Sequence, residues 1–111
     1  MAIKYGFYFI VEGNTKRIEI PNHVIEMLDV FKFDMVTLSI KGLEGHSWRV
    51  AVGVDNGDGK FYLQDGVAEL IKHYKLKEKF CIVFKAISES VLEILMFDKS
   101  GAKIDYGNPP I

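Results

Sequence analysis

Residues 48–63 run WRVAVGVDNGDGKFYL, an alternating apolar segment followed by a turn and a second, shorter apolar segment. Trp48, Val50 and Val52 share one face of an extended chain, because successive side chains of a strand point to opposite sides. The Asn-Gly and Asp-Gly pairs between the two segments favour the left-handed backbone of a tight turn. The sequence therefore predicts a β-hairpin here, with one face of its first strand buried.

The same pattern of short segments rich in Val, Ile, Phe and Tyr, separated by turn residues, extends along the chain in both directions. We expect strands at Tyr5–Val11, Arg17–Ile20, Met35–Lys41, Trp48–Val54, Lys60–Leu63, Phe80–Ala86 and Val91–Phe97. Most links between them are too short for a crossover helix, which favours antiparallel pairing. Seven short strands of this kind close most easily as a small barrel.

Two segments have the spacing of short helices instead. Pro21 suits the first position of one helix, and Asp65 suits the N-cap of the other. Apolar residues at helical spacing are Val24, Met27 and Leu28 in the first, and Val67, Leu70, Ile71 and Tyr74 in the second. The predicted fold is mainly β: a seven-stranded open antiparallel pseudobarrel with two short helices capping its ends.

Length and charge restrict the classes of function. The 111 residues suit one domain spanning 1–111. With 14 Lys and Arg against 15 Asp and Glu, the formal net charge is −1, which excludes a polybasic tail but allows a local basic face. Cys81 is the single cysteine, so no intrachain disulfide can form. The apolar run 7–11 is too short to span a membrane, and we expect a soluble intracellular chain.

Catalytic and metal-binding patterns are missing from the sequence. His23, His46 and His73 fall on three different predicted elements, without the spacing of metal ligands. There is no Gly-x-Ser-x-Gly elbow and no phosphate-binding Walker loop. Cys81 begins an apolar strand, where we expect a buried, unreactive thiol. We therefore expect no enzyme activity, no metal and no cofactor.

The aromatic residues are expected to fill the barrel. Trp48 belongs to an alternating strand and is predicted to be a core residue rather than a platform for bases. The same expectation holds for Phe7, Phe9, Phe80, Phe84 and Phe97.

Several short motifs follow one another in a specific order. They are Arg17-Ile18-Glu19-Ile20-Pro21, Trp48-Arg49-Val50, Leu63 followed by Gly66, Ile82-Val83-Phe84-Lys85, and Phe97-Asp98-Lys99-Ser100-Gly101 with Tyr106 beyond it. In order and spacing they resemble the B3 DNA-binding domain of plant transcription factors, and in particular its reproductive-meristem branch. The resemblance covers about residues 5–106.

Three positions depart from the pattern of that family. Val67 and Leu70 stand where the family usually has Trp and Phe, and both remain apolar. Residues 76–80 stand where it often has Leu-x-x-Gly-Asp, so that Lys79 takes the place of a turn glycine and Phe80 that of an acid. The third departure predicts an altered loop.

The resemblance implies binding of double-stranded DNA by two loops that enter the major groove, in a nuclear transcription regulator. We call residues 12–17 the first arm and residues 55–60 the second arm. The candidate contacts are Asn14, Thr15, Lys16, Arg17, Arg49, Asn56 and Lys60. The cations among them would anchor phosphates, while Asn14 or Lys16 and Asn56 would contact base edges.

Other interpretations remain open for the same residues. Each arm also fits a plain solvated turn, and Asp55 and Asp58 would repel phosphates. The lysine-rich run 72–79 fits a helix C-terminus, where lysines favourably oppose the helix dipole. The alternative function is a protein-interaction or dimerisation module without DNA affinity, whose partners would be other regulators or a second copy. The recognition domain of a restriction-type nuclease fits the barrel but not the segment 97–101.

Overall fold

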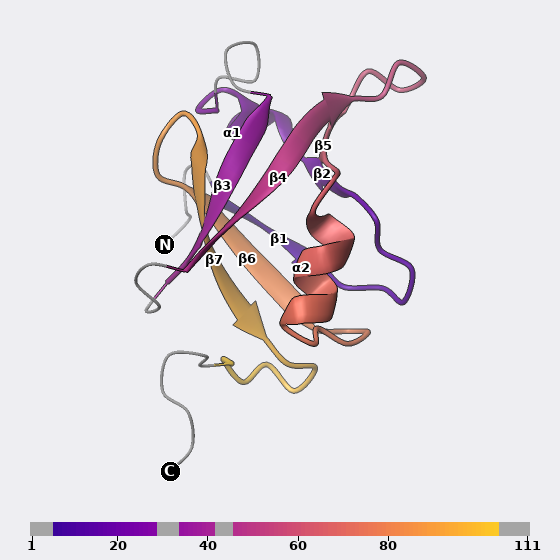
Figure 1. Cartoon of the computed structure of the whole chain (residues 1–111), viewed down its shortest axis with the longest axis vertical. Helices are drawn as coiled ribbons and strands as arrows, with labels where there is room; N and C mark the ends of the chain where they lie inside the picture. Colours follow the sequence, from indigo (N-terminus) through magenta and orange to yellow (C-terminus); the bar gives the residue numbers. More distant parts are fainter. Residues whose placement is uncertain (1–5, 29–33, 42–45, 105–111) are drawn as a thin grey trace.

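The computed structural model describes residues 6–28, 34–41 and 46–104. Its elements, in chain order, are β1 (Gly6–Ile10), β2 (Ile18–Ile20), α1 (Asn22–Ile25), β3 (Met35–Ile40), β4 (Ser47–Val54), β5 (Phe61–Leu63), α2 (Val67–His73), β6 (Cys81–Ala86) and β7 (Val91–Phe97) (Figure 1). Each predicted strand is confirmed with small shifts at its ends. Tyr5 and Tyr106, which the sequence analysis also used, lie outside the described residues.

The seven strands form one sheet in the order β1-β6-β7-β3-β4-β5-β2. The sheet curls into a nearly closed barrel with β1 and β2 at its two edges (Figure 1). The expectation of purely antiparallel pairing is wrong at one place, because β3 and β7 run parallel, with Leu38 opposite Leu92. Short links enforce antiparallel pairing only between strands adjacent in the sequence, whereas β4, β5, α2 and β6 all lie between these two.

The barrel core is built from alternate residues of the strands. In β3 the predicted inward row is confirmed, since Val36, Leu38 and Ile40 are buried and Thr37 and Ser39 are partly exposed. Other fully enclosed side chains are Val50, Leu63, Ile82, Phe84, Leu92 and Ile94 from the strands, with Val24, Val67 and Leu70 from the helices. Each such aliphatic or aromatic side chain stabilises the fold by about 1.5–3 kcal/mol relative to an exposed one.

The phenylalanines do not share one role. Phe84 is fully buried and stacks on Phe7 with 4.6 Å between ring centroids. Phe97 was expected inside the barrel, but Ile82 and Met96 take the inward positions of β6 and β7, which leaves Phe97 on the outer face opposite Cys81. The expectation of a buried Cys81 is also wrong: it is only half-buried. Partial burial raises the pKa of its thiol, which favours the unreactive protonated form.

Helix α2 joins the barrel through Gly66. This residue, and not the predicted Asp65, is the N-cap, with a φ of 106° and no side-chain cap. A Cβ at this position would lie 2.8 Å from the carbonyl oxygen of Arg49, so the close approach of α2 to β4 requires glycine. Trp48 is half-buried rather than fully enclosed, and its Nε1–H donates to the Gly66 carbonyl over 3.0 Å. The tryptophan thus fastens α2 to the side of the barrel.

Helix α1 is a single turn at one side of β1. Pro21 is its N-cap, with a ψ of 151°, and therefore stands one position before the predicted one. Val24 and Leu28 are buried and Met27 is half-buried, as the spacing predicted. Nε2 of His23 lies 2.8 Å from the carbonyl oxygen of Gly6, which ties the helix to the edge strand β1.

The loop that departs from the family pattern keeps a tight turn. The Phe80 N–H donates to the Lys77 carbonyl over 3.0 Å, and Lys79 adopts a φ of 75°. A lysine therefore takes the left-handed conformation that glycine adopts without strain. Lysine in place of glycine makes this turn conformationally less favourable, but the turn still forms.

Candidate nucleic-acid interface

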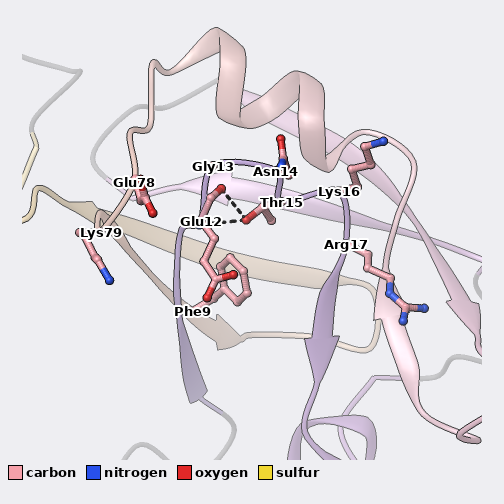
Figure 2. A pocket seen from close by; sticks show the side chains of 9 residues that line it. All are labelled: Phe9, Glu12, Gly13, Asn14, Thr15, Lys16, Arg17, Glu78 and Lys79. Carbon is pink, nitrogen blue, oxygen red and sulfur yellow. Dashed lines mark hydrogen bonds between the residues drawn. The ribbon is translucent and has the colours of Figure 1, made fainter.

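The first arm connects β1 to β2 and is closed on itself by Thr15. The Thr15 hydroxyl donates to the Glu12 carbonyl over 2.9 Å, and the Glu12 N–H donates back to that hydroxyl over 3.0 Å (Figure 2). The Thr15 N–H also donates to the Glu12 carbonyl. Thr15 is a candidate DNA contact, and its hydroxyl also holds the loop.

The side chains of the first arm diverge. Figure 2 shows Asn14 and Lys16 projecting from one side of the loop and Arg17 from the other. Asn14, Lys16 and Arg17 are all exposed. A hollow of about 830 Å³ lies beside the arm, lined by Phe9, Glu12, Gly13, Asn14, Thr15, Lys16, Arg17, Glu78 and Lys79. The arm therefore presents polar groups to solvent on both sides.

The second arm is the predicted hairpin between β4 and β5, and its two aspartates hold the turn. One Asp55 oxygen accepts the Gly57 N–H over 2.7 Å, and one Asp58 oxygen accepts the Lys60 N–H over 2.8 Å. Gly59 has a φ of 72°, which explains a glycine there. Asn56 is exposed in the turn. The two aspartates, which were expected to repel phosphates, thus have a structural role.

The two arms meet through Arg17. Its guanidinium lies 2.8 Å from the second oxygen of Asp55 and 3.9 Å from the centroid of the Tyr62 ring. The Tyr62 hydroxyl donates to Asp58 over 2.7 Å. The antiparallel pairing of β2 with β5 places Ile18 opposite Leu63 and Ile20 opposite Phe61, so the end of β2 lies next to the hairpin. Arg17 precedes β2 at its other end, and its side chain reaches Asp55 across the Tyr62 ring.

A second ion pair spans the same strands. Nζ of Lys60 lies 3.6 Å from a carboxylate oxygen of Glu19, and both side chains are about half exposed. Pairs this exposed contribute little to stability. The carboxylate nevertheless offsets the positive potential that the lysine presents to a ligand. Two of the predicted phosphate contacts, Arg17 and Lys60, therefore already have carboxylate partners.

The ion pair and hydrogen bonds shift the titration of the groups involved. The hydrogen bond from Arg17, and then that from the Gly57 N–H, lower the pKa of Asp55. The hydrogen bond from Tyr62 lowers the pKa of Asp58 and raises that of the tyrosine. Both aspartates are consequently ionised at neutral pH, and the network keeps its charges there.

The other candidates differ in position. Lys16, Asn14 and Asn56 form no hydrogen bond or ion pair with other residues in the described part of the chain. Arg49 is exposed on β4, as alternation predicted, but it stands six residues before Asp55, about 20 Å away along the strand. The structure therefore brings Arg17, Asp55 and Lys60 together and leaves Arg49 apart from the second arm.

Glu19 and Tyr62 belong to this site although the sequence alone did not predict it. Glu19 was seen only as part of a motif, and Tyr62 only as a strand residue. The register of β2 on β5 pairs them directly, Glu19 opposite Tyr62. A correct pairing of these two strands would have been the signal, since directly opposed side chains interact across a sheet.

Within 6–28, 34–41 and 46–104, no three His, Cys, Asp or Glu side chains cluster as metal ligands would. Neither helix in those ranges is long and apolar enough to cross a membrane.

The barrel order and the two joined arms can be compared with known proteins. The family model of the B3 DNA binding domain matches residues 8–100. The chain belongs to the B3 DNA binding domain family. This B3 domain is 27% identical over 104 residues to the B3 domain-containing transcription factor VRN1 of Arabidopsis thaliana, covering 90% of this chain and 29% of that protein. The chain thus spans less than a third of the length of that relative.

The fold of this B3 domain has a solved counterpart. The structure of a hypothetical Arabidopsis thaliana protein superposes with a TM-score of 0.59 at 20% sequence identity. The match covers 88% of this chain and 96% of that chain. At this identity the likeness concerns the fold, and it agrees with the mainly β, seven-stranded, nearly closed barrel described above.

Proposed function

We propose that this B3 domain binds double-stranded DNA through its two arms, without catalytic activity, as part of a plant transcription regulator that acts in the nucleus. Membership of the family supports the class of ligand. The observation that carries the rest is the contact between Arg17 and Asp55, which joins the bases of the two arms. Two polar loops whose bases are joined in this way can contact one duplex together.

The contacts divide into phosphate anchors and base readers. Lys16 and Arg49 are exposed cations without carboxylate partners among the described residues, and they bind phosphates. The amides of Asn14 and Asn56 suit adenine, which offers one donor and one acceptor in the major groove. Arg17 and Lys60 reach phosphates only by exchanging their present carboxylate partners.

This arrangement sets the expected strength of binding. The two arms contain three cations and three carboxylates, so they attract phosphates weakly. We expect modest affinity and a shallow dependence on salt, with a slope of about −3 to −5 in the plot of log K against log salt.

Titration of duplex DNA with the chain, at low and at moderate salt, tests the proposal. Lys16→Ala combined with Arg17→Ala should weaken binding severalfold, while Lys41→Ala combined with Lys85→Ala, on exposed positions away from the arms, should not. Asn14→Ala and Asn56→Ala should change the sequences recovered from a random DNA pool. Absence of binding at low salt, or indifference to the first pair of substitutions, contradicts the proposal.

Two finer assignments accompany it. We place the chain in the reproductive-meristem-like branch of the family, as the resemblance in the order and spacing of its motifs implies. We also take 1–111 as a single domain with a core at about 5–106. Limited proteolysis that yields one resistant fragment of nearly this extent would support the second assignment.

One observation favours a second candidate function, self-association. The outer face of β1, β6 and β7 is apolar, with Tyr8 70% and Ile10 41% exposed and Val83, Leu95 and Phe97 beside them. β1 is also an edge strand, which another copy can extend. Tyr8→Lys with Leu95→Lys should then abolish a dimer seen in sedimentation equilibrium. A chain that stays monomeric at all concentrations rules this candidate out.

A further inference from the structure

A second basic region adjoins the first arm on the side of α2. A groove of about 500 Å³ separates the arm from the C-terminal end of the helix. We call it the lysine groove, because Lys16 stands on one wall and Lys72, Lys75 and Lys77 stand on the other. Its floor includes the apolar side chains of Ala68, Ile71 and Leu76.

The four ammonium groups of the lysine groove are not neutralised within the described chain. The ion pairs formed by residues 6–28, 34–41 and 46–104 are Arg17 with Asp55 and Lys60 with Glu19, and neither involves a groove lysine. All four lysines are exposed. Positive charges from two facing walls reinforce one another and attract anions into the space between them.

The helix dipole explains only part of this cluster. Lys72 lies in the last turn of α2, where a cation is favourable on its own. Lys75 follows the helix in a left-handed conformation, with a φ of 54°. The Lys75 N–H donates to Lys72 and the Leu76 N–H to Ile71, which forms the helix ending that normally carries glycine at this position. A lysine here costs conformational energy and supplies charge.

The wall formed by the first arm adds donors of another kind. In the described part of the chain, the main-chain N–H groups of Gly13, Asn14 and Lys16 donate to no protein acceptor. Loop N–H groups of this kind bind phosphate oxygens. Arg17 of the same loop forms the ion pair with Asp55 of the second arm. A duplex held by the arms is therefore adjacent to the groove.

We propose that the lysine groove binds the phosphate backbone of the same DNA duplex, beyond the segment that the two arms contact. The inference rests on the proposed function. Lysine ammonium groups act as point charges that suit a row of phosphates without demanding a fixed geometry. Each neutralised phosphate contributes about 0.9 to the salt slope, so Lys16, Arg49, Lys72, Lys75 and Lys77 together give about −4.5.

The experiment compares two double variants of equal charge in salt-dependent titrations of duplex DNA. Lys72→Gln with Lys77→Gln should make the slope shallower by about 1.8 and weaken binding severalfold at low salt. Lys41→Gln with Lys85→Gln removes the same charge elsewhere and should leave the slope unchanged. Preference among DNA sequences should stay the same in both, because backbone contacts carry no base information.

Lys75→Gly provides a variant that cannot fail merely by unfolding. Relief of the left-handed conformation should raise Tm by about 2–5 °C, while the loss of one cation should lower DNA affinity and the slope by about 0.9. A lysine with only a structural role would not show weaker binding together with higher stability.

The possible outcomes separate the two proposals. If the wild-type chain binds DNA and the Lys72 and Lys77 variant keeps its slope, the groove proposal is wrong and the proposed function stands. If the salt slope and the affinity fall by the same amount in both double variants, the overall charge of the chain attracts the DNA. The groove is then not a binding site. Titration with poly-glutamate provides a further test. If the Lys72 and Lys77 variant loses binding of poly-glutamate but keeps binding of DNA, the groove is a surface for acidic peptides. A wild-type chain that binds no duplex overturns both proposals.

Discussion

The surface formed by residues 12–17 and 55–60, which we call the two-arm face, shares the first arm with the lysine groove. The two regions differ in whether their cations have carboxylate partners. On the two-arm face, Arg17 and Lys60 are held by Asp55 and Glu19. In the groove, the described chain offers no carboxylate partner to Lys16, Lys72, Lys75 or Lys77. The first region has fixed geometry and little net charge, while the second has net charge and flexible side chains.

This difference separates two tasks that a DNA-binding surface must combine. Base recognition needs groups in fixed positions, and ion pairs fix them at the cost of attraction for phosphates. Non-specific attraction needs only unpaired charge close to the duplex. A net charge of −1 for the whole chain conceals this division, since acidic residues elsewhere in the sequence offset the positive charge of the groove.

The largest effect is expected where the helix of the groove is attached to the barrel. Gly66→Val should lower the free energy of unfolding by about 2–4 kcal/mol, because its side chain meets the Arg49 carbonyl and Val50 in a left-handed conformation. Urea unfolding measures this loss. Gly13→Ala is the control, since no atom lies within 4 Å of its Cβ, and should change stability by less than about 0.5 kcal/mol. Equal losses in the two variants would contradict the close packing of α2.

A smaller effect should follow from the hydrogen bond that fastens the same helix. Trp48→Phe keeps an aromatic ring but leaves the Gly66 carbonyl without its donor. We expect a loss of about 1–2 kcal/mol in the free energy of unfolding, because a half-buried carbonyl loses its partner. The Trp48 indole N–H should also exchange slowly with solvent in the wild type. Fast exchange would show that the bond does not form.

The ion pair between the arms can be broken without changing the shape of the turn. Asp55→Asn keeps an oxygen for the Gly57 N–H but releases Arg17. The freed guanidinium should contact one more phosphate, which strengthens DNA binding a few-fold at low salt and steepens the salt slope by about 0.9. Asp58→Asn also removes one negative charge but leaves Arg17 paired, so its slope should stay that of the wild type. A wild-type slope in Asp55→Asn would mean that Arg17 does not reach DNA.

The smallest effect concerns acid stability. The folded chain lowers the pKa of Asp55 and Asp58 below the unfolded value of about 3.9. Their contribution to stability is therefore complete above about pH 4 and is lost as the pH falls through the lowered folded values. Urea midpoints measured from pH 7 downward should decline less steeply in Asp55→Asn than in the wild type. Parallel curves would contradict a lowered pKa for Asp55.

Local pattern was sufficient to predict the elements but not their partners. Alternation in β3 and β4 and the turn residues at 55–59 located the strands and the hairpin. Alternation could not tell which strand each face would meet, so Phe97 was placed inside the barrel and the parallel pairing of β3 with β7 was missed. Asp65 was the better cap by residue type, but the approach of α2 to β4 required a glycine next to it.

The sequence by itself determined the mainly β class, the seven strands and the two polar loops, because periodicity and turn preference act between neighbouring residues. Only the tertiary structure decided which cations are neutralised. Arg17 and Asp55 are separated by 38 positions and Lys16 by still more from Lys72, Lys75 and Lys77, and each meeting depends on how the sheet curls. Electrostatic interaction depends on distance in space, which the spacing of residues along the chain does not contain.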